Sequence, residues 1–305
     1  MLGWQFFFAL FGVVVVVIIV VMYFLAAYVA KPNYHTVTEI TQELRENGFW
    51  RDYDSMAKEE LRISSCDGYI LHATYIPAKD PVLDRYVIIS HGYTCNRFSS
   101  VRYVHLFHKL GYHCMIYDNR SHGNNRKGIC TLGKRENADL TAMIRYMKKR
   151  FGKDIKLGLH GESMGSALQT LALHDKPKVD FLIDDCGFAR LMDVLMNNIG
   201  NSLHLPRWLC YPASAASKCF FGFSYTGTRP IDELKNNEIP ICFIHGEADT
   251  FIPCEQSKMM YEATKGYREL HLFPGAEHAL SINTDEARYE QVVREFLAHV
   301  YPEEV

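Results

Sequence analysis

The chain has 305 residues, of which 48% are hydrophobic and 22% are charged, and these fractions exclude a wholly disordered protein. Its 33 Lys and Arg against 35 Asp and Glu give a formal net charge of −2. That balance provides no long-range attraction toward nucleic acid or toward an anionic membrane surface. The length fits one large α/β domain or two small ones.

The first element is a long apolar stretch, because residues 6–30 carry no charged side chain. As a helix at about 1.5 Å per residue it extends about 37 Å, which exceeds a bilayer core of about 30 Å. Trp4 and Tyr28 flank the stretch, as aromatic residues at membrane interfaces often do. We therefore predict one transmembrane anchor over residues 4–30 and a single-pass protein of the cell membrane.

A cleaved signal peptide is the alternative interpretation of this stretch. A signal peptide has a basic beginning and a shorter apolar core, whereas residues 1–5 contain no Lys or Arg. The sequence thus favours an uncleaved signal anchor. Lys31 is the only immediate flanking cation, so the flanking charges do not indicate which side of the membrane the rest of the chain occupies.

The nine cysteines indicate free thiols. No two of them have the C-x-x-C spacing of a structural zinc site, and their odd, scattered distribution does not resemble a disulfide framework. Mostly free, buried thiols mildly favour the reducing face of a membrane. The cysteines are at positions 66, 95, 114, 130, 186, 210, 219, 242 and 254.

After the apolar stretch we expect a linker over residues 31–58, with one helical pattern at 38–48, and then a folded domain over 59–305. Within the domain, short apolar runs alternate with amphipathic ones. This alternation predicts an α/β fold with right-handed crossovers and a mostly parallel sheet covered by helices on both faces. The expected strands are 61–64, 69–76, 86–90, 114–117, 156–159, 179–183, 241–244 and 269–273. The expected helices are 96–110, 136–151, 164–173 and 285–300.

Residues 187–229 interrupt the alternation with an apolar, aromatic and irregular segment. It lies between two expected strands, where one crossover helix would be enough. Because its aromatic content exceeds what one helix face can bury, we predict a small lid over the functional site. Residues 203–225 are expected to shape an acyl pocket. The alternative is a pair of surface helices without contact to substrate.

The strongest motif is Gly-Glu-Ser-Met-Gly at residues 161–165, between the strand 156–159 and the helix 164–173. A tight turn of this kind holds the serine at a strained backbone angle with its hydroxyl exposed, and the glycines let strand and helix approach. The start of the helix offers backbone N–H groups to an oxyanion. The motif predicts Ser163 as a nucleophile; an ordinary surface serine is the alternative.

A serine nucleophile needs a base, and the base needs an orienting carboxylate. Asp249 follows the strand 241–244 and His278 follows the strand 269–273, so both are expected at the carboxyl edge of the sheet. We predict that His278 is the base and Asp249 the acid, although Asp249 is also suited to a structural turn. Three other carboxylates could take the role of the acid: Glu247, Asp184 and Asp185.

An oxyanion hole requires two N–H groups. The residue after the nucleophile, Met164, is expected to supply one. The loop after the strand 86–90 reads His-Gly-Tyr-Thr, and Gly92 there would allow a close approach. We therefore predict the backbone N–H of Tyr93 as the second donor, with a simple tight turn at His91 and Gly92 as the alternative.

These segments resemble the serine α/β-hydrolase superfamily, and within it the membrane-anchored or secreted bacterial-type esterases near the cinnamoyl-esterase and dipeptidyl-peptidase-like branches. The resemblance spans residues 60–302, and its order of Ser163, Asp249 and His278 is that of the superfamily. The matching segments are 91–93, 118–123, 161–165, 245–253 and 275–278. Segment 118–123 departs from the family pattern, with Ser121 where glycine is common. It is interpreted as a structural turn, so His122 is not expected to be catalytic.

The resemblance implies the α/β-hydrolase fold with an eight-stranded sheet, no cofactor or metal, and acyl transfer to water. It also argues against dehalogenases and epoxide hydrolases, which have an aspartate at the nucleophile position. We predict a carboxylic ester hydrolase that acts on a small-molecule ester or lipid, with the membrane as its one other partner and no partner protein. A peptidase, a thioesterase and a lysophospholipase-type acyl hydrolase are alternatives with the same triad. A non-catalytic, membrane-tethered binding protein is the alternative from another class.

Overall fold

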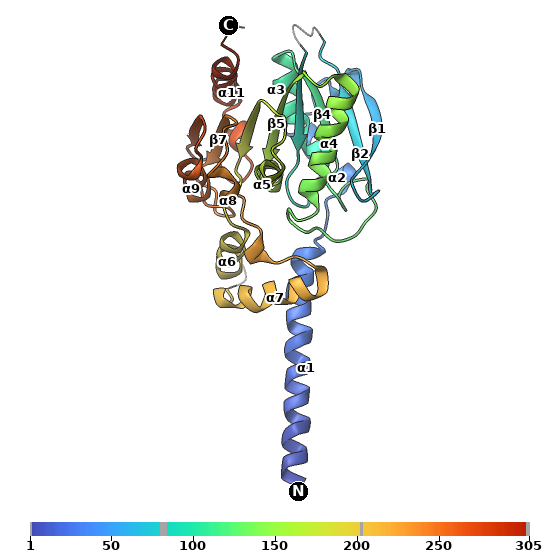
Figure 1. Ribbon diagram of the computed structural model, residues 1–305, viewed down its shortest axis with the longest axis vertical. Coiled ribbons are helices and arrows are strands. Elements are labelled where there is room, and N and C mark those ends of the chain that lie inside the picture. The colour runs from blue at the N-terminus through green and yellow to red at the C-terminus, as the bar shows by residue number, and fades with distance from the viewer. Residues whose placement is uncertain (1, 80–83, 202–203, 303–305) are drawn as a thin grey trace.

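The computed structural model describes residues 2–79, 84–201 and 204–302. It consists of a long apolar helix joined to a sheet that carries helices on both faces (Figure 1). The strands are β1 (Glu59–Ser64), β2 (Ile70–Ile76), β3 (Arg85–Ser90), β4 (His113–Tyr117), β5 (Lys156–Glu162), β6 (Phe181–Asp185), β7 (Ile241–Gly246) and β8 (Arg268–Phe273). The helices are α1 (Leu2–Ala30), α2 (Val37–Glu46), α3 (Val101–Lys109), α4 (Glu136–Phe151), α5 (Met164–Ala172), α6 (Leu191–Asn201), α7 (Cys210–Phe221), α8 (Ile231–Leu234), α9 (Glu255–Ala263), α10 (Ser281–Thr284) and α11 (Glu286–Val300).

The eight strands form one sheet in the order β1-β2-β4-β3-β5-β6-β7-β8. β2 is antiparallel to both of its neighbours, and the strands from β4 to β8 are all parallel. The predicted α/β-hydrolase fold is thereby confirmed. Each predicted strand is present, with ends that differ by at most three residues. Because the central strands run in parallel, their carboxyl ends lie along one edge of the sheet.

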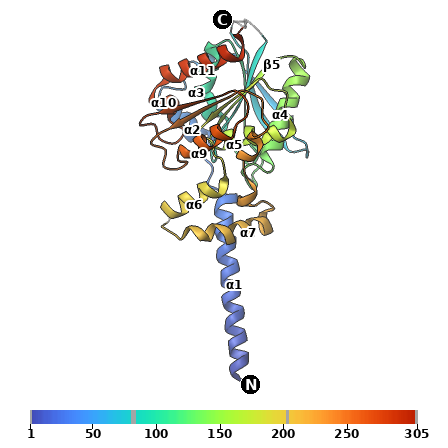
Figure 2. The same cartoon turned by 60° about the vertical axis from the view of Figure 1, so that its left-hand side comes forward.

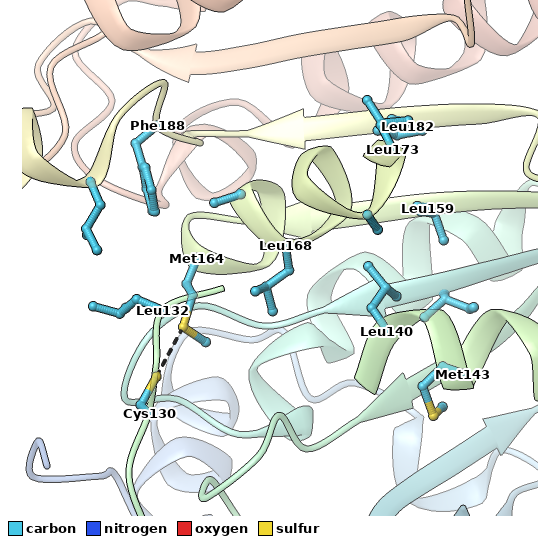
Figure 3. Close-up of a cluster of buried hydrophobic side chains, with 14 of the residues drawn as sticks. Cys130, Leu132, Leu140, Met143, Leu159, Met164, Leu168, Leu173, Leu182 and Phe188 are labelled. Carbon is cyan, nitrogen blue, oxygen red and sulfur yellow. Dashed lines mark hydrogen bonds between the residues drawn. The ribbon is translucent and has the colours of Figure 1, made fainter. Parts of the chain in front are cut away.

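The two faces of the sheet pack into separate hydrophobic cores. Along β3, Ile88 contributes to one core while Val87 and Ile89 contribute to the other, as the two-residue repeat of a strand requires. The first core contains the buried sides of α4 and α5, and Figure 3 shows Leu140 and Met143 of α4 beside the strands and α5. The second core contains residues of α3 and α11. These cores hold α5 against the sheet at the position where the functional site is built.

The segment at 31–58, predicted as a linker, carries the expected helix as α2. Thr36 caps this helix, since its hydroxyl accepts the N–H of Glu39 at 3.1 Å while the Glu39 carboxylate accepts the N–H of Thr36 at 2.7 Å. Ile40 and Leu44 of α2 are buried in the second core. The chain between α1 and the sheet is therefore packed onto the domain.

The segment predicted as a lid contains α6 and α7, which lie between the sheet domain and the N-terminal part of α1 (Figures 1 and 2). α7 crosses α1, and the ring of Tyr23 contacts the rings of Phe220 and Phe221. Leu203, which was expected to begin the pocket-forming part, lies outside the described residues. Within the described chain, residues 4–30 of α1 are the one stretch long and apolar enough to cross a membrane.

Candidate active site

Ser163 occupies a strained turn between β5 and α5. Its backbone angles are φ 55° and ψ −113°, in a region that residues with a side chain rarely adopt. A Cβ atom on Gly161 would lie 2.4 Å from the backbone of Gly165, and one on Gly165 would lie 2.1 Å from the carbonyl oxygen of Ser90. Both glycines are thus required by the close approach of strand and helix, as the motif predicts.

Replacement of Gly165 with alanine is expected to destabilise the protein. The new methyl group would collide with the backbone of β3, which cannot rotate away, so α5 must shift and move Ser163 with it. An overpacking cost of about 3 kcal/mol corresponds to a fall in melting temperature of roughly 5–10 °C, measurable by thermal unfolding in detergent micelles. Gly12→Ala is the matched control, because nothing lies within 4 Å of its added Cβ. Equal melting temperatures for the two variants would contradict this account of the turn.

His278 and Asp249 reach Ser163 from the loops after β8 and β7. His278 Nε2 lies 2.9 Å from Ser163 Oγ, and His278 Nδ1 lies 2.6 Å from Asp249 Oδ2. The structure therefore brings the three side chains of the predicted triad into one hydrogen-bonded chain. With the proton of His278 on Nδ1, the serine hydroxyl donates to Nε2 and the imidazole donates to the carboxylate, which is the arrangement that activates a serine.

The surroundings of Asp249 stabilise its charged form. Its Oδ1 accepts the backbone N–H groups of Phe251 at 2.9 Å and Ile252 at 2.8 Å, and its Oδ2 lies 3.3 Å from His245 Nε2. Burial by itself raises the pKa of this carboxyl group, but the hydrogen bonds from His245 and His278 and the backbone outweigh burial and lower the pKa to about 2. Asp249 therefore offers His278 a negative charge at neutral pH.

The other carboxylates considered for this role have different surroundings. Glu247 is exposed. Asp184 and Asp185 are fully buried, and burial raises the pKa of Asp184 to about 7 and that of Asp185 to about 6. The Asp185 carboxylate accepts the hydroxyls of two buried tyrosines. Of the four carboxylates, Asp249 is the one hydrogen-bonded to His278.

The two residues predicted to donate to an oxyanion lie next to Ser163. Met164 is the first residue of α5, and Tyr93 follows Gly92 in the loop after β3. A Cβ atom on Gly92 would lie 3.5 Å from the Cβ of Ser163, so this loop passes directly against the nucleophile. Tyr93 and Met164 both line the cavity beside Ser163. The role of their backbone N–H groups as oxyanion donors stays a prediction.

The segment at 118–123 is a buried turn that supports the neighbouring loop. Asp118 accepts the backbone N–H and the guanidinium of Arg97, at 2.8 and 2.6 Å. Asn119 donates its backbone N–H to His91 Nε2 at 2.9 Å, which ties this turn to the loop of Tyr93. Ser121 has a φ of 70°, which explains why glycine is common there. His122 is fully buried, and its Nδ1 is hydrogen-bonded to the backbone of the same turn.

Sequence reasoning missed Arg102, which connects the nucleophile turn to the histidine loop. Its guanidinium donates to Glu162 Oε2 at 2.5 Å and to the carbonyl oxygen of Ala279 at 3.2 Å. These two partners are the residue before Ser163 and the residue after His278. Arg102 therefore helps to fix the separation of the two side chains. A single arginine on α3 gave no signal of this role in the sequence.

A cavity of about 280 Å³ adjoins Ser163 and Met164. Its walls come from the lid, from the loops after β6 and β7 and, unexpectedly, from the end of α1. In the described part of the chain no charged side chain lines it. The apolar wall residues include Leu25, Val29, Leu132, Phe188, Leu191, Val194, Leu195, Ile199, Ala213 and Ile252.

Two groups of potential metal ligands occur among the described residues. The first consists of Asp249 and His278 of the proposed triad with Cys186, and the second of Cys242, Glu269 and His271. Burial raises the pKa of both cysteine thiols well above its ordinary value. In the first group, Asp249 Oδ2 and His278 Nδ1 are already hydrogen-bonded to each other at 2.6 Å.

Comparison with known families places the chain among hydrolases. A family model described as serine aminopeptidase, S33, matches residues 82–190, and a second described as the dienelactone hydrolase family matches residues 210–298. The first match includes the turn of Ser163, and the second includes Asp249 and His278.

One relative and two solved structures are similar to most of this chain. YqkD of Bacillus subtilis, an uncharacterized protein, is 31% identical over 267 residues, which cover 86% of this chain and 87% of YqkD. The Pyrococcus furiosus esterase Pf2001 matches with a TM-score of 0.68 at 24% identity, over 82% of this chain and 94% of the esterase. A Pyrococcus horikoshii acylaminoacyl peptidase matches with a TM-score of 0.62 at 18% identity, over 79% of this chain and 41% of the peptidase. At these identities the structures show a shared fold.

Proposed function

Because the chain belongs to the serine α/β-hydrolase superfamily, we propose that it hydrolyses carboxylic esters through an acyl-enzyme on Ser163. The observation that carries the proposal is the hydrogen-bonded chain from Ser163 through His278 to Asp249. A non-catalytic binding protein would have no need to keep these three groups in contact, or to hold the serine in a strained turn.

The reaction proceeds in two acyl transfers. Ser163 Oγ attacks the ester carbonyl carbon while its proton passes to His278 Nε2, and the resulting oxyanion lies against the N–H groups of Tyr93 and Met164. The bond to the leaving alcohol breaks as His278 gives the proton to that oxygen. Water then attacks the acyl carbon with His278 as base, which releases the carboxylic acid and restores the serine hydroxyl. Asp249 stabilises the imidazolium in both halves.

A serine peptidase is the second candidate, because the serine aminopeptidase model matches the segment that holds Ser163. An aminopeptidase has to bind the ammonium group of its substrate, for which a carboxylate is the usual partner. The described wall of the cavity contains no charged side chain. This apolar wall favours an uncharged acyl group over an aminoacyl group with a free ammonium.

The proposed location is the membrane, with α1 as an uncleaved anchor. Residues 4–30 of α1 have the length and apolar character that a membrane span requires. A removable signal sequence passes the same test. Retention is favoured because Ala26 and Ala30 are fully buried against the domain, so that removal of α1 would expose part of the first core.

The full-length protein in detergent micelles is expected to hydrolyse p-nitrophenyl esters and to react with a fluorophosphonate probe at Ser163. Release of p-nitrophenol and mass spectrometry of the labelled peptide measure the two reactions. Labelling of Ser163 together with hydrolysis of aminoacyl p-nitroanilides, but of no ester, would favour the peptidase. If neither labelling nor hydrolysis occurred, the proposal would be wrong and the non-catalytic alternative would take its place.

A further inference from the structure

The apolar helix α1 consists of a free part and a docked part. Residues 4–21 are all exposed, whereas residues 22–30 are partly or fully buried against the domain, with the exception of the exposed Phe24 and Tyr28. The free part gives about 27 Å of helix at about 1.5 Å per residue, close to a bilayer core of about 30 Å. If residues 4–21 span the bilayer, the docked part begins at the membrane surface.

The docked part is hydrogen-bonded into the domain. The Tyr93 hydroxyl donates to the carbonyl oxygen of Val29 at 2.6 Å, and the backbone N–H of Cys130 donates to that of Ala30 at 2.9 Å. These bonds satisfy carbonyl groups that the last turn of a helix leaves without partners. Tyr93 is also the predicted oxyanion donor, so the end of α1 is fastened to the loop that adjoins Ser163.

Side chains of the docked part form one wall of the cavity beside Ser163. Leu25, Tyr28 and Val29 face the same cavity as Ser163 and Met164. Other walls come from α6 and α7 of the lid. The cavity therefore lies between Ser163 and the docked end of α1. Figures 1 and 2 show that α6 and α7 lie beside this end of α1.

The lid carries exposed apolar side chains, and one of them contacts α1. Trp208 is 64% exposed and Tyr211 is 58% exposed, and Phe220 is also exposed while its ring lies 5.2 Å from that of Tyr23 on α1. Aromatic residues concentrate at membrane interfaces, where one end of the ring is apolar and the other meets water. The contact between Phe220 and Tyr23 places part of this exposed surface beside the end of the free part of α1, an arrangement that suits a lid resting on the bilayer surface.

We propose that the cavity takes the apolar chain of an acyl ester that resides in the membrane, and that Leu25, Tyr28 and Val29 of α1 determine the accepted chain length. The inference rests on the proposed ester hydrolysis at Ser163. One wall of the cavity is the anchor helix α1. An acyl chain can therefore pass from the bilayer along α1 into the cavity and stay in apolar surroundings until it reaches Ser163. The anchor is then part of the substrate-binding site.

The test compares substitutions on the two parts of α1 in the full-length protein, reconstituted in phosphatidylcholine vesicles. Val29→Trp fills the cavity from its α1 wall, and Val17→Trp makes the same change on the free part, where Val17 is exposed. The measurement is the ratio of kcat/KM for p-nitrophenyl dodecanoate to that for p-nitrophenyl acetate. We expect Val29→Trp to lower this ratio at least about tenfold, because a change of a few methylene volumes in a pocket alters discrimination between substrates by that order. Val17→Trp should leave the ratio unchanged.

A second variant distinguishes a change in chain-length preference from misfolding. Val29→Ala enlarges the cavity without a steric clash and is expected to shift the preferred p-nitrophenyl ester toward longer chains. An unchanged ratio and chain preference in both Val29 variants, with Ser163 still labelled by a fluorophosphonate, would overturn this inference and leave ester hydrolysis intact. A wild-type protein that cleaves neither ester and is not labelled would instead overturn the proposed function.

Discussion

Substitution of Ser163 with alanine is expected to lower kcat for a p-nitrophenyl ester by about 10⁴- to 10⁶-fold. The alanine removes the oxygen that forms the acyl-enzyme, while the oxyanion donors and the cavity remain to give a small residual rate. The methyl side chain fits the space of the hydroxymethyl group, so the fold should be kept. Steady-state hydrolysis by the full-length protein in detergent micelles, beside a thermal unfolding scan, measures both quantities.

The control for this experiment is Ser64→Ala, which makes the same change at an exposed position on β1. This control should keep both activity and fluorophosphonate labelling, and Ser163→Ala should lose both. Wild-type activity in a correctly folded Ser163→Ala protein would show that a different residue is the nucleophile.

Asp249→Asn is expected to lower kcat by about 10⁴-fold at neutral pH. The carboxylate accepts a hydrogen bond from His278 Nδ1 at 2.6 Å, and it stabilises the imidazolium that forms when the serine proton is taken up. An amide is uncharged, and its NH₂ group can donate to Nδ1, which favours the tautomer that cannot accept the serine proton. Rates of ester hydrolysis and of fluorophosphonate labelling should fall together.

Glu247→Gln serves as the matched control, because Glu247 is an exposed carboxylate two residues before Asp249. Its activity should equal that of the wild type. Should Glu247→Gln lose activity while Asp249→Asn keeps it, the orienting acid has been misassigned.

The wild-type protein and Asp249→Asn should also differ in how their free energy of unfolding depends on pH. Folding lowers the pKa of Asp249 to about 2, below its ordinary value of about 3.9, so the charged group stabilises the fold above the higher pKa. This contribution, about 2 kcal/mol, is lost as the pH falls from about 4 to about 2. The melting temperatures of wild type and Asp249→Asn should therefore converge over that range.

Much of the fold could be predicted because its signals are local. A parallel strand buried on both faces is a short apolar run, and the turn at Ser163 needs glycine at two defined positions. α9 was missed for an equally local reason, since its buried side includes Gln256 and Ser257 as well as Met260. Buried polar side chains conceal the apolar repeat that identifies a helix.

The contribution of α1 to the candidate site could not be predicted from the same kind of signal. A helix that is apolar on all sides has no distinct face, so its sequence does not indicate which residues contact the domain. Leu25 and Val29 resemble the other apolar residues of the stretch until the fold brings the loop of Tyr93 and α7 against them. The role of Arg102 could not be predicted either, because a charged residue on a helix usually lies on the solvent-exposed face.

The hydrogen bonds from Tyr93 and Cys130 fix the end of α1 to the domain, so the anchor and the domain move together. In the proposed arrangement Ser163 is consequently held at a constant height above the bilayer, in one orientation. Such an enzyme meets its substrate by lateral diffusion in two dimensions, and its rate follows the surface density of the ester rather than its bulk concentration. Dilution of the ester with inert lipid should then slow the enzyme, while dilution of the vesicles in buffer should not.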